Sequence, residues 1–286
     1  MTPPNVAALA SAVCLVLSFA PHADAAQHSP QQIRVEYVPP KNPAHQPIYD
    51  EIKQAQALER IQELLSPLRL PRPLLVKVTG CDGESNAWYD EDTITVCYEF
   101  LADILKNATE QTLPTGTTRR DTIIGPLVDV FLHESGHAVF DLLKIPLFGR
   151  EEDAADQFSA YIMLHFGKED ARRLIEGAAY QYKADQQKWQ GSTATTKFAN
   201  VHGTPAQRFY NVLCIAYGAD QTLFADVVKK GYLPEDRADG CDGEYEQVAY
   251  AFKTLIDPHL DKALASKVLK TWMREVDTPQ RRPPNR

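Results

Sequence analysis

The segment FLHESGHAVF (residues 131–140) decides the fold, because it places H-E-x-x-H inside an apolar run. Residues four apart lie one turn apart on one face of a helix, so His133 and His137 can reach one metal ion. Glu134 lies about 100° round the helix from His133, beside the metal, where it can accept a proton from bound water. Unpaired His and Glu side chains on such a buried helix would be costly. The alternative is two core histidines bonded to the backbone and a surface glutamate.

The third metal ligand is expected from the next helix, whose first turn is acidic. A catalytic zinc ion has three protein ligands and one open position. Glu152 can bind the metal, while Asp156, four residues later on the same face, accepts the free N–H of a ligand histidine. Glu151 is the rival ligand, but its own partner position four residues on is Ala155. An acidic first turn that only complements the helix dipole is the alternative.

These motifs resemble those of the gluzincin metallopeptidases, in which H-E-x-x-H is followed by E-x-x-A-D. Here the two motifs are residues 133–137 and 152–156. Two further matches resemble the small gluzincins related to the CAAX prenyl proteases and the HtpX-like proteases. Asn86-Ala87 is similar to the edge strand that holds extended substrate in those enzymes. His202 with Arg208 resembles their H-P-x-x-x-x-R motif, with Gly203 in place of the proline.

A closer resemblance is to a family of exported bacterial proteins known only as candidate metallopeptidases. It rests on residues 133–163 and on the motif Gln207-Arg208-x-Tyr210-Asn211-x-x-Cys214. It covers most of the chain after the N-terminal segment. Together the resemblances imply a single metallopeptidase domain over residues 49–277 that holds one Zn²⁺. The membrane spans of the prenyl-protease and HtpX-like enzymes are absent, so their membrane substrates are not carried over.

The expected activity is an exported zinc-dependent endopeptidase that hydrolyses peptide bonds with metal-activated water and Glu134 as general base. His202 is the first candidate for stabilising the oxyanion, with Tyr210 and Arg208 as alternatives. If Arg208 does not have this role, we expect it, like Asp156, to support the metal ligands from behind. The strand at Asn86-Ala87 would pair with a peptide or unfolded protein substrate, although a plain turn-to-strand junction would look the same.

Two other classes of function remain open. One is a catalytically silent zinc-binding pseudoenzyme or assembly factor, against which Glu134 speaks, because a purely structural site needs no base. Structural sites also often close with a cysteine, and none lies within residues 133–156. The other is a zinc amidase or esterase that acts on a non-protein acyl substrate, since the same groups attack any acyl carbon. Manganese or cobalt would also fit two histidines and one carboxylate.

The N-terminus predicts export. Residues 6–20 are almost all apolar or small, and Ala23-Asp24-Ala25 follows as a small-x-small cleavage pattern, so residues 1–25 read as a signal peptide. The absence of Lys and Arg before the apolar run leaves an uncleaved anchor as the alternative. We expect a periplasmic or secreted protein without stable membrane insertion after cleavage. The net charge of −8 argues against nucleic acid as a partner.

Four cysteines remain after such a cleavage, which predicts two disulfides in an exported protein. The expected pairs are Cys81–Cys97 and Cys214–Cys241, because each brackets a compact segment. Four buried free thiols are the alternative, and would fit a cytosolic protein. The spacing excludes a C-x-x-C zinc site.

The hydrophobic pattern predicts an α+β fold, with a small N-terminal sheet followed by a mainly helical body. The resemblance implies that the sheet has an edge strand and that the helical body is of the zincin type. Residues 26–48 are Pro-rich and read as an extended lead-in, and residues 278–286 as a disordered tail. The expected strands are 74–78, 87–89 and 93–98. The expected helices are 49–65, 99–108, 120–144, 150–166, 169–189, 204–217, 220–230 and 244–273.

Overall fold

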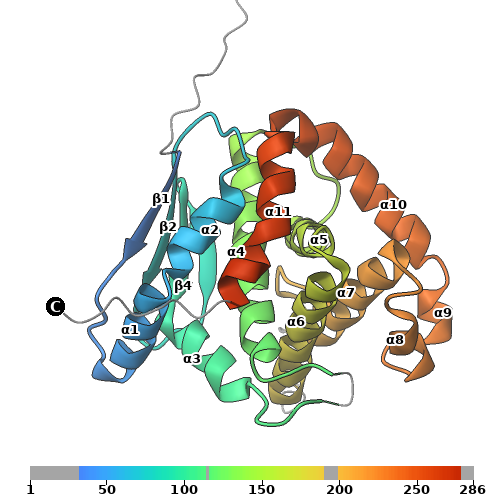
Figure 1. The fold of residues 1–286 in the computed structure, drawn as a ribbon, viewed down its shortest axis with the longest axis horizontal. Helices are drawn as coiled ribbons and strands as arrows, with labels where there is room; N and C mark the ends of the chain where they lie inside the picture. The colour runs from blue at the N-terminus through green and yellow to red at the C-terminus, as the bar shows by residue number, and fades with distance from the viewer. Residues whose placement is uncertain (1–31, 114–115, 190–198, 278–286) are drawn as a thin grey trace, which may run out of the picture.

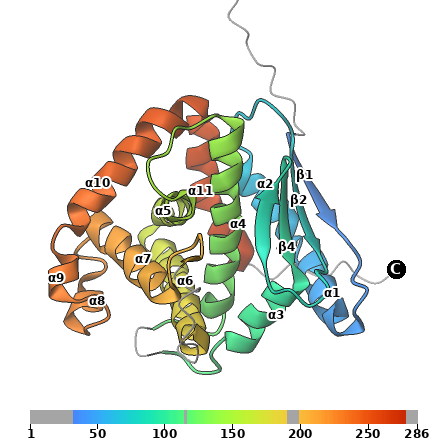
Figure 2. The same ribbon diagram turned by 180° about the vertical axis from the view of Figure 1, so that it is seen from behind.

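The computed structural model describes residues 32–113, 116–189 and 199–277. The expected signal peptide and C-terminal tail lie outside these residues. The fold is α+β, as the sequence predicts: a small sheet with its helices forms the N-terminal part, and helices form the rest (Figure 1). The sheet lies on one side of helix α4 (Asp121–Leu142), and most of the later helices lie on the other (Figure 2).

The sheet has four strands in the order β1-β2-β4-β3, which are β1 (Ile33–Tyr37), β2 (Leu74–Thr79), β3 (Ala87–Asp90) and β4 (Thr93–Cys97). The first three in this order are parallel, and β3 is antiparallel to β4. Glu91 and Asp92 form the hairpin turn, both with positive φ (45° and 61°), as a two-residue turn of this hand requires. The expected edge strand is therefore β3, at one side of the sheet.

Strand β1 was not predicted and falls within the segment expected to be a lead-in. Its sequence IRVEY puts charged residues between apolar ones, and this period-two pattern suits a strand with one buried face. The extended lead-in expected over 26–48 is therefore wrong in part, because Ile33–Tyr37 pairs with β2, Pro43–His45 forms a 3₁₀ turn and helix α1 (Gln46–Gln54) follows.

The helices of the N-terminal part are α1 (Gln46–Gln54), α2 (Ala57–Leu65) and α3 (Tyr98–Asn107), preceded by a 3₁₀ turn at Pro43–His45. The single helix expected over 49–65 is wrong. Gln56 adopts a left-handed backbone conformation (φ 52°, ψ 44°), and this breaks the segment into two helices. The apolar spacing on either side of the break is helical, so periodicity alone could not reveal it.

The helical body contains α4, α5 (Glu151–Leu164), α6 (Lys168–Trp189), α7 (Pro205–Ala219), α8 (Ala225–Lys229), α9 (Glu235–Ala238), α10 (Cys241–Ala251) and α11 (Lys262–Asp277). The helix expected over 244–273 is in fact interrupted by a π-helical turn at Phe252–Ile256 and a 3₁₀ turn at Asp257–His259. Pro258 explains the interruption, since proline lacks the N–H that a continuing helix needs. The helix expected over 220–230 shortens to α8.

Helix α4 packs closely against α6 through two glycines. A Cβ on Gly177 would lie 2.2 Å from the backbone oxygen of Asp121, and one on Gly125 would lie 2.6 Å from the Gly177 Cα. The backbones of the two helices therefore touch, and α4 is held firmly at its N-terminal half.

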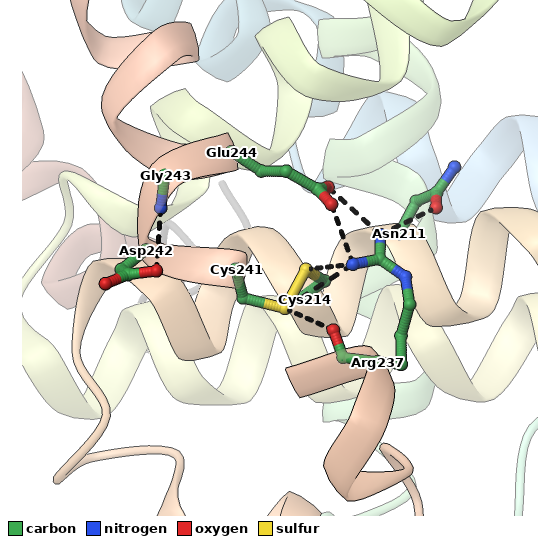
Figure 3. The surroundings of a disulfide bond; sticks show 7 residues. All are labelled: Asn211, Cys214, Arg237, Cys241, Asp242, Gly243 and Glu244. Atoms are coloured by element: carbon green, nitrogen blue, oxygen red, sulfur yellow. Dashed lines mark hydrogen bonds and ion pairs between the residues drawn. A yellow bond between two sulfur atoms is a disulfide. The ribbon is translucent and has the colours of Figure 1, made fainter. Parts of the chain in front are cut away.

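Both expected disulfides are present, Cys81–Cys97 and Cys214–Cys241. The second joins α7 to α10, and Figure 3 shows the guanidinium of Arg237 beside it, with Nη1 2.7 Å from the Cys214 sulfur. The same guanidinium forms an ion pair with Glu244. Within the described part of the chain, no helix has the length and apolar character to cross a membrane.

Candidate metal centre

The two histidines of H-E-x-x-H lie on one face of α4, as their spacing predicts. Their Nε2 atoms are 3.3 Å apart. Apolar residues flank the motif and bury this stretch of α4, so that the His133 side chain is only 4% exposed. Two imidazoles that share a face can present their ring nitrogens to one ion.

Glu152 comes from the first turn of α5 and lies between the two histidines. Its Oε2 is 3.1 Å from the His133 Nε2 and 3.3 Å from the His137 Nε2. Small residues bring the two helices together: a Cβ on Gly136 would lie only 3.2 Å from the Ala155 Cα. The glycine within the histidine motif and the alanine of E-x-x-A-D thus allow α5 to approach α4 closely enough for Glu152 to reach the histidines.

Carboxylates hold the other ring nitrogen of each histidine. Asp156 Oδ1 lies 2.8 Å from the His133 Nδ1, and Glu151 Oε1 lies 2.8 Å from the His137 Nδ1. Such contacts favour the tautomer with the proton on Nδ1 and leave Nε2 free as a ligand. Of the two rival glutamates, Glu152 lies between the histidines and Glu151 lies behind one of them. The contact of Glu151 with His137 was not predicted, because the sequence argument considered Glu151 only as a rival metal ligand and not as a partner of a histidine.

Arg208, on α7, reaches Asp156 from the far side. Its Nε and Nη2 lie 2.8 and 2.5 Å from the two carboxylate oxygens, which is a bidentate pair. Burial alone would raise the pKa of the Asp156 carboxyl, but Arg208 and His133 hold that pKa well below its usual range. Asp156 is therefore ionised and fixed in orientation where it contacts the ligand histidine.

His202 joins the same cluster from the turn before α7. Its Nε2 lies 2.8 Å from the Glu152 Oε2, and its ring stacks on that of His133 with 5.7 Å between centroids. His133, Glu152 and His202 each place a ligand atom within 4.8 Å of the others. The sequence could name His202 from the partial motif, but it could not show that His202 shares a carboxylate with the ligands.

Tyr210 lies apart from this cluster in the described contacts. Its side chain is on α7, the residue is 39% exposed, and its ring contacts Phe209. No described contact joins it to the histidines or to Glu152, in contrast to Arg208, which acts through Asp156.

The cluster fits a tetrahedral divalent metal ion. Ligand atoms at about 2.0–2.1 Å from a tetrahedral centre are separated by about 3.3 Å. The three separations among His133 Nε2, His137 Nε2 and Glu152 Oε2 are 3.1, 3.3 and 3.3 Å. The donor atoms, imidazole nitrogen and carboxylate oxygen, suit such an ion as well.

The electrostatics of the cluster depend on burial and on these close contacts. Desolvation raises the pKa of the buried Glu134 carboxyl. Burial would lower the pKa of His133, yet hydrogen bonds to Asp156 and Glu152 raise it to about 9. In the metal-free protein the cluster therefore holds a proton near neutral pH, which a bound cation would have to displace.

Strand β3 is the edge strand of the sheet beside α4, and its outer edge is open in the sense that no described strand pairs with it. The Cys97 N–H donates to the Asn86 carbonyl, and alternate residues of an antiparallel ladder bond to the partner strand. Ala87 and Tyr89 therefore direct their backbone groups to the open edge, although the Asn86 side chain accepts from the Ala87 N–H at 2.9 Å. The Tyr89 hydroxyl donates to Asp141 of α4, four residues beyond His137, which fixes the strand next to the metal helix.

This arrangement, a helix whose histidines could hold a metal ion, with a buried glutamate and a strand edge alongside, is the one expected of a metal-dependent hydrolase. A family model with the description "Putative metallopeptidase" matches residues 37–256, and the chain belongs to this family. The match runs from the last residue of β1 to the end of the π-helical turn, and so includes every residue of the cluster. No curated protein and no solved structure matches the chain.

Proposed function

We propose that the protein is an exported zinc-dependent endopeptidase. One observation carries the proposal: the Nε2 atoms of His133 and His137 and the Oε2 of Glu152 have the separations of three ligands around one tetrahedral ion. Membership of a metallopeptidase family supports the same reaction class. The two disulfides are compatible with export.

A zinc ion, when bound, supplies Lewis acidity, which polarises the scissile carbonyl and lowers the pKa of water. Glu134 accepts the proton of the attacking water and transfers it to the leaving amine. Its burial suits this task, because desolvation raises its pKa toward that of a base able to give the proton back. Asp156 and Glu151 keep the two imidazoles in the tautomer that leaves Nε2 free.

The open edge of β3 orients the substrate. An extended peptide can add to this edge by hydrogen bonds to the backbone of Ala87 and Tyr89. The side chain of Asn86, which accepts from the Ala87 N–H in the free protein, would have to turn away as the peptide pairs. Main-chain pairing of this kind selects unfolded or extended segments, so the substrate we propose is an unstructured protein.

The position of His202 favours one competing function. With its Nε2 2.8 Å from the Glu152 Oε2, it could act as a fourth ligand. Four protein ligands are typical of structural zinc sites, whereas catalytic sites keep one position open. The competing function is therefore a catalytically silent zinc-binding protein. In the endopeptidase, His202 instead donates a hydrogen bond to the oxyanion.

The decisive experiment compares zinc content and hydrolysis of an unstructured protein for the wild type and Glu134→Gln. We expect about one zinc per chain in both, with activity reduced at least about 100-fold in Glu134→Gln. Absence of bound zinc in the wild type would contradict the assigned centre. Equal zinc without hydrolysis by the wild type would favour the silent zinc-binding protein.

His202→Ala separates the two roles of His202. If His202 is the oxyanion donor, its removal should lower kcat by about 100- to 1,000-fold while zinc affinity is kept. If His202 is a fourth ligand, its removal should weaken zinc binding instead. His165→Ala is the matched control, because His165 is an exposed histidine that contacts Tyr161 away from the cluster.

A further inference from the structure

The polar contacts behind the metal centre continue past Arg208 into the core. The guanidinium carbon of Arg208 lies 4.5 Å from the centroid of the Tyr182 ring, which is a cation–π contact. The Tyr182 hydroxyl donates to Asp129 Oδ2 at 2.6 Å. The Ser159 hydroxyl donates to Asp129 Oδ1 at 2.7 Å. Both oxygens of the Asp129 carboxylate are therefore occupied by hydroxyl groups.

These three residues are buried and belong to three helices. Asp129, Ser159 and Tyr182 are 7%, 0% and 7% exposed, and they come from α4, α5 and α6. Asp129 lies four residues before His133 on α4, and Ser159 lies three residues after Asp156 on α5. The group thus connects α4, which carries His133 and His137, and α5, which carries Glu152 and Asp156, to the ring that contacts Arg208.

Stability alone is a poor reason for such a group. A buried carboxylate and hydroxyls bring a desolvation penalty, and apolar residues of similar size often stabilise a core as well or better. The group instead fixes the orientation of two side chains. The hydrogen bond from the Tyr182 hydroxyl to Asp129 holds the Tyr182 ring against Arg208. The Arg208 guanidinium then donates to both oxygens of Asp156.

We propose that Asp129, Ser159 and Tyr182 are positioning residues of the metal centre, which act through Arg208 and Asp156 on His133. The inference rests on the proposed metal site, and it extends that site from the ligands past Asp156 and Arg208 into the core. Partners of metal-ligating histidines typically change metal affinity about 10- to 100-fold when removed. Tyr182 lies two contacts beyond Asp156, the partner of His133, so its removal should have an effect at or below the lower end of this range.

The test is a titration of the metal-free full-length protein with Zn²⁺ and with Co²⁺, whose visible absorption reports ligand geometry. Tyr182→Phe removes the hydroxyl but keeps the ring over Arg208, and Asp129→Asn keeps the shape but replaces one acceptor oxygen with an amide nitrogen. We expect each to weaken Zn²⁺ binding about 5- to 10-fold and to alter the Co²⁺ spectrum. The double variant should lose little more than the worse single variant, because both act along one path.

The matched control is Asp121→Asn. Asp121 is also a buried carboxylate of α4, 4% exposed, and it pairs with Arg173 of α6. It lies twelve residues before His133, or about 18 Å along the helix. This substitution should lower the melting temperature without changing Zn²⁺ affinity or the Co²⁺ spectrum.

Two outcomes would overturn the inference: the first leaves the proposed function standing, and the second removes both. If Tyr182→Phe and Asp129→Asn lower the melting temperature but bind Zn²⁺ within twofold of the wild type, the group only joins helices. That result leaves a hydrolytic metal centre intact. If the wild type itself binds no Zn²⁺, both proposals fail together. A wild type that binds zinc without hydrolysis would refute the endopeptidase while leaving the effect of these residues on metal affinity measurable.

Discussion

At the scale of single residues, the smallest side chains of the site have a clear physical role. Gly136 stands between the two histidines, where helix propensity alone would favour alanine by about 1 kcal/mol. The close approach of α5 opposes that preference, because a Cβ would meet the Cα of Ala155 at 3.2 Å and the Cβ of Phe158 at 3.4 Å. These contacts are tight, and relief requires α5 to move away from α4.

Gly136→Ala should therefore weaken metal binding. A shift of α5 carries Glu152 away from the histidines, and we expect a loss of about tenfold in Zn²⁺ affinity with no gain in melting temperature. Calorimetric titration and thermal unfolding of the metal-free protein measure both quantities. Gly243→Ala is the control, since a Cβ there meets no atom within 4 Å. A variant that is more stable and binds zinc normally would show that the helices are not held in contact by this glycine.

The residues of the site also show where sequence reasoning succeeds. The i,i+4 spacing placed His133 and His137 on one face, and the i,i+4 pair Glu152 and Asp156 on the next helix, because both relations are local. The contact of His202 with Glu152 spans fifty residues and depends on how α7 packs. Tyr182 carried no signal, because a tyrosine in an amphipathic helix reads as core.

At the scale of elements, local breaks in helices and short elements escaped prediction, whereas long elements did not. The left-handed Gln56 and the turn at Pro258 each divide a segment whose apolar spacing is helical throughout. Strand β1 was missed because five residues with two charges give a weak signal, and only pairing with β2 makes them a strand. The metal helices were predicted within two residues, because long apolar periodicity and an acidic first turn mark them.

A charge cluster links α6 to α8 and makes part of the stability depend on pH. Arg172 of α6 lies 2.8 Å from Asp226 of α8, and Lys230 lies 2.9 Å from the same carboxylate. Arg172 and Lys230 lower the pKa of Asp226 to about 2, against the effect of burial. Because the folded pKa lies below the unfolded value, the contribution is full above about pH 4 and is lost as the pH falls through 2.

Asp226→Asn should therefore destabilise the protein by about 1–2 kcal/mol at pH 7, a figure reduced for partial exposure. The difference from the wild type should shrink as the pH falls from 4 toward 2. Urea unfolding at a series of pH values measures it, in a Glu176→Gln background for both proteins, because burial and the nearby Asp226 raise the pKa of Glu176. A difference that stays constant down to pH 2.5 would show that Asp226 contributes through packing and not through charge.

At the scale of the whole molecule, the two disulfides fix different parts of the fold. Cys214–Cys241 joins α7 to α10, where a Cβ on Gly218 would lie 2.0 Å from the Cys241 carbonyl oxygen, so the two helices are already in backbone contact. Cys81–Cys97 closes the loop that leads into β3, and the Cys97 N–H binds the Asn86 carbonyl. Of the two disulfides, only Cys81–Cys97 is adjacent to the strand that we propose for substrate pairing.

Removal of each disulfide should therefore have separable consequences. With loops of 16 and 27 residues, either double substitution to alanine should cost about 2–4 kcal/mol in unfolding free energy. Cys81→Ala with Cys97→Ala should in addition raise KM for an unstructured protein substrate several-fold with bound zinc unchanged, because the open edge of β3 loses its anchor. Cys214→Ala with Cys241→Ala should leave KM unchanged at temperatures where the variant is folded. If both pairs change KM equally, the edge of β3 is not the surface on which substrate is held, and the peptide must reach the metal by another route.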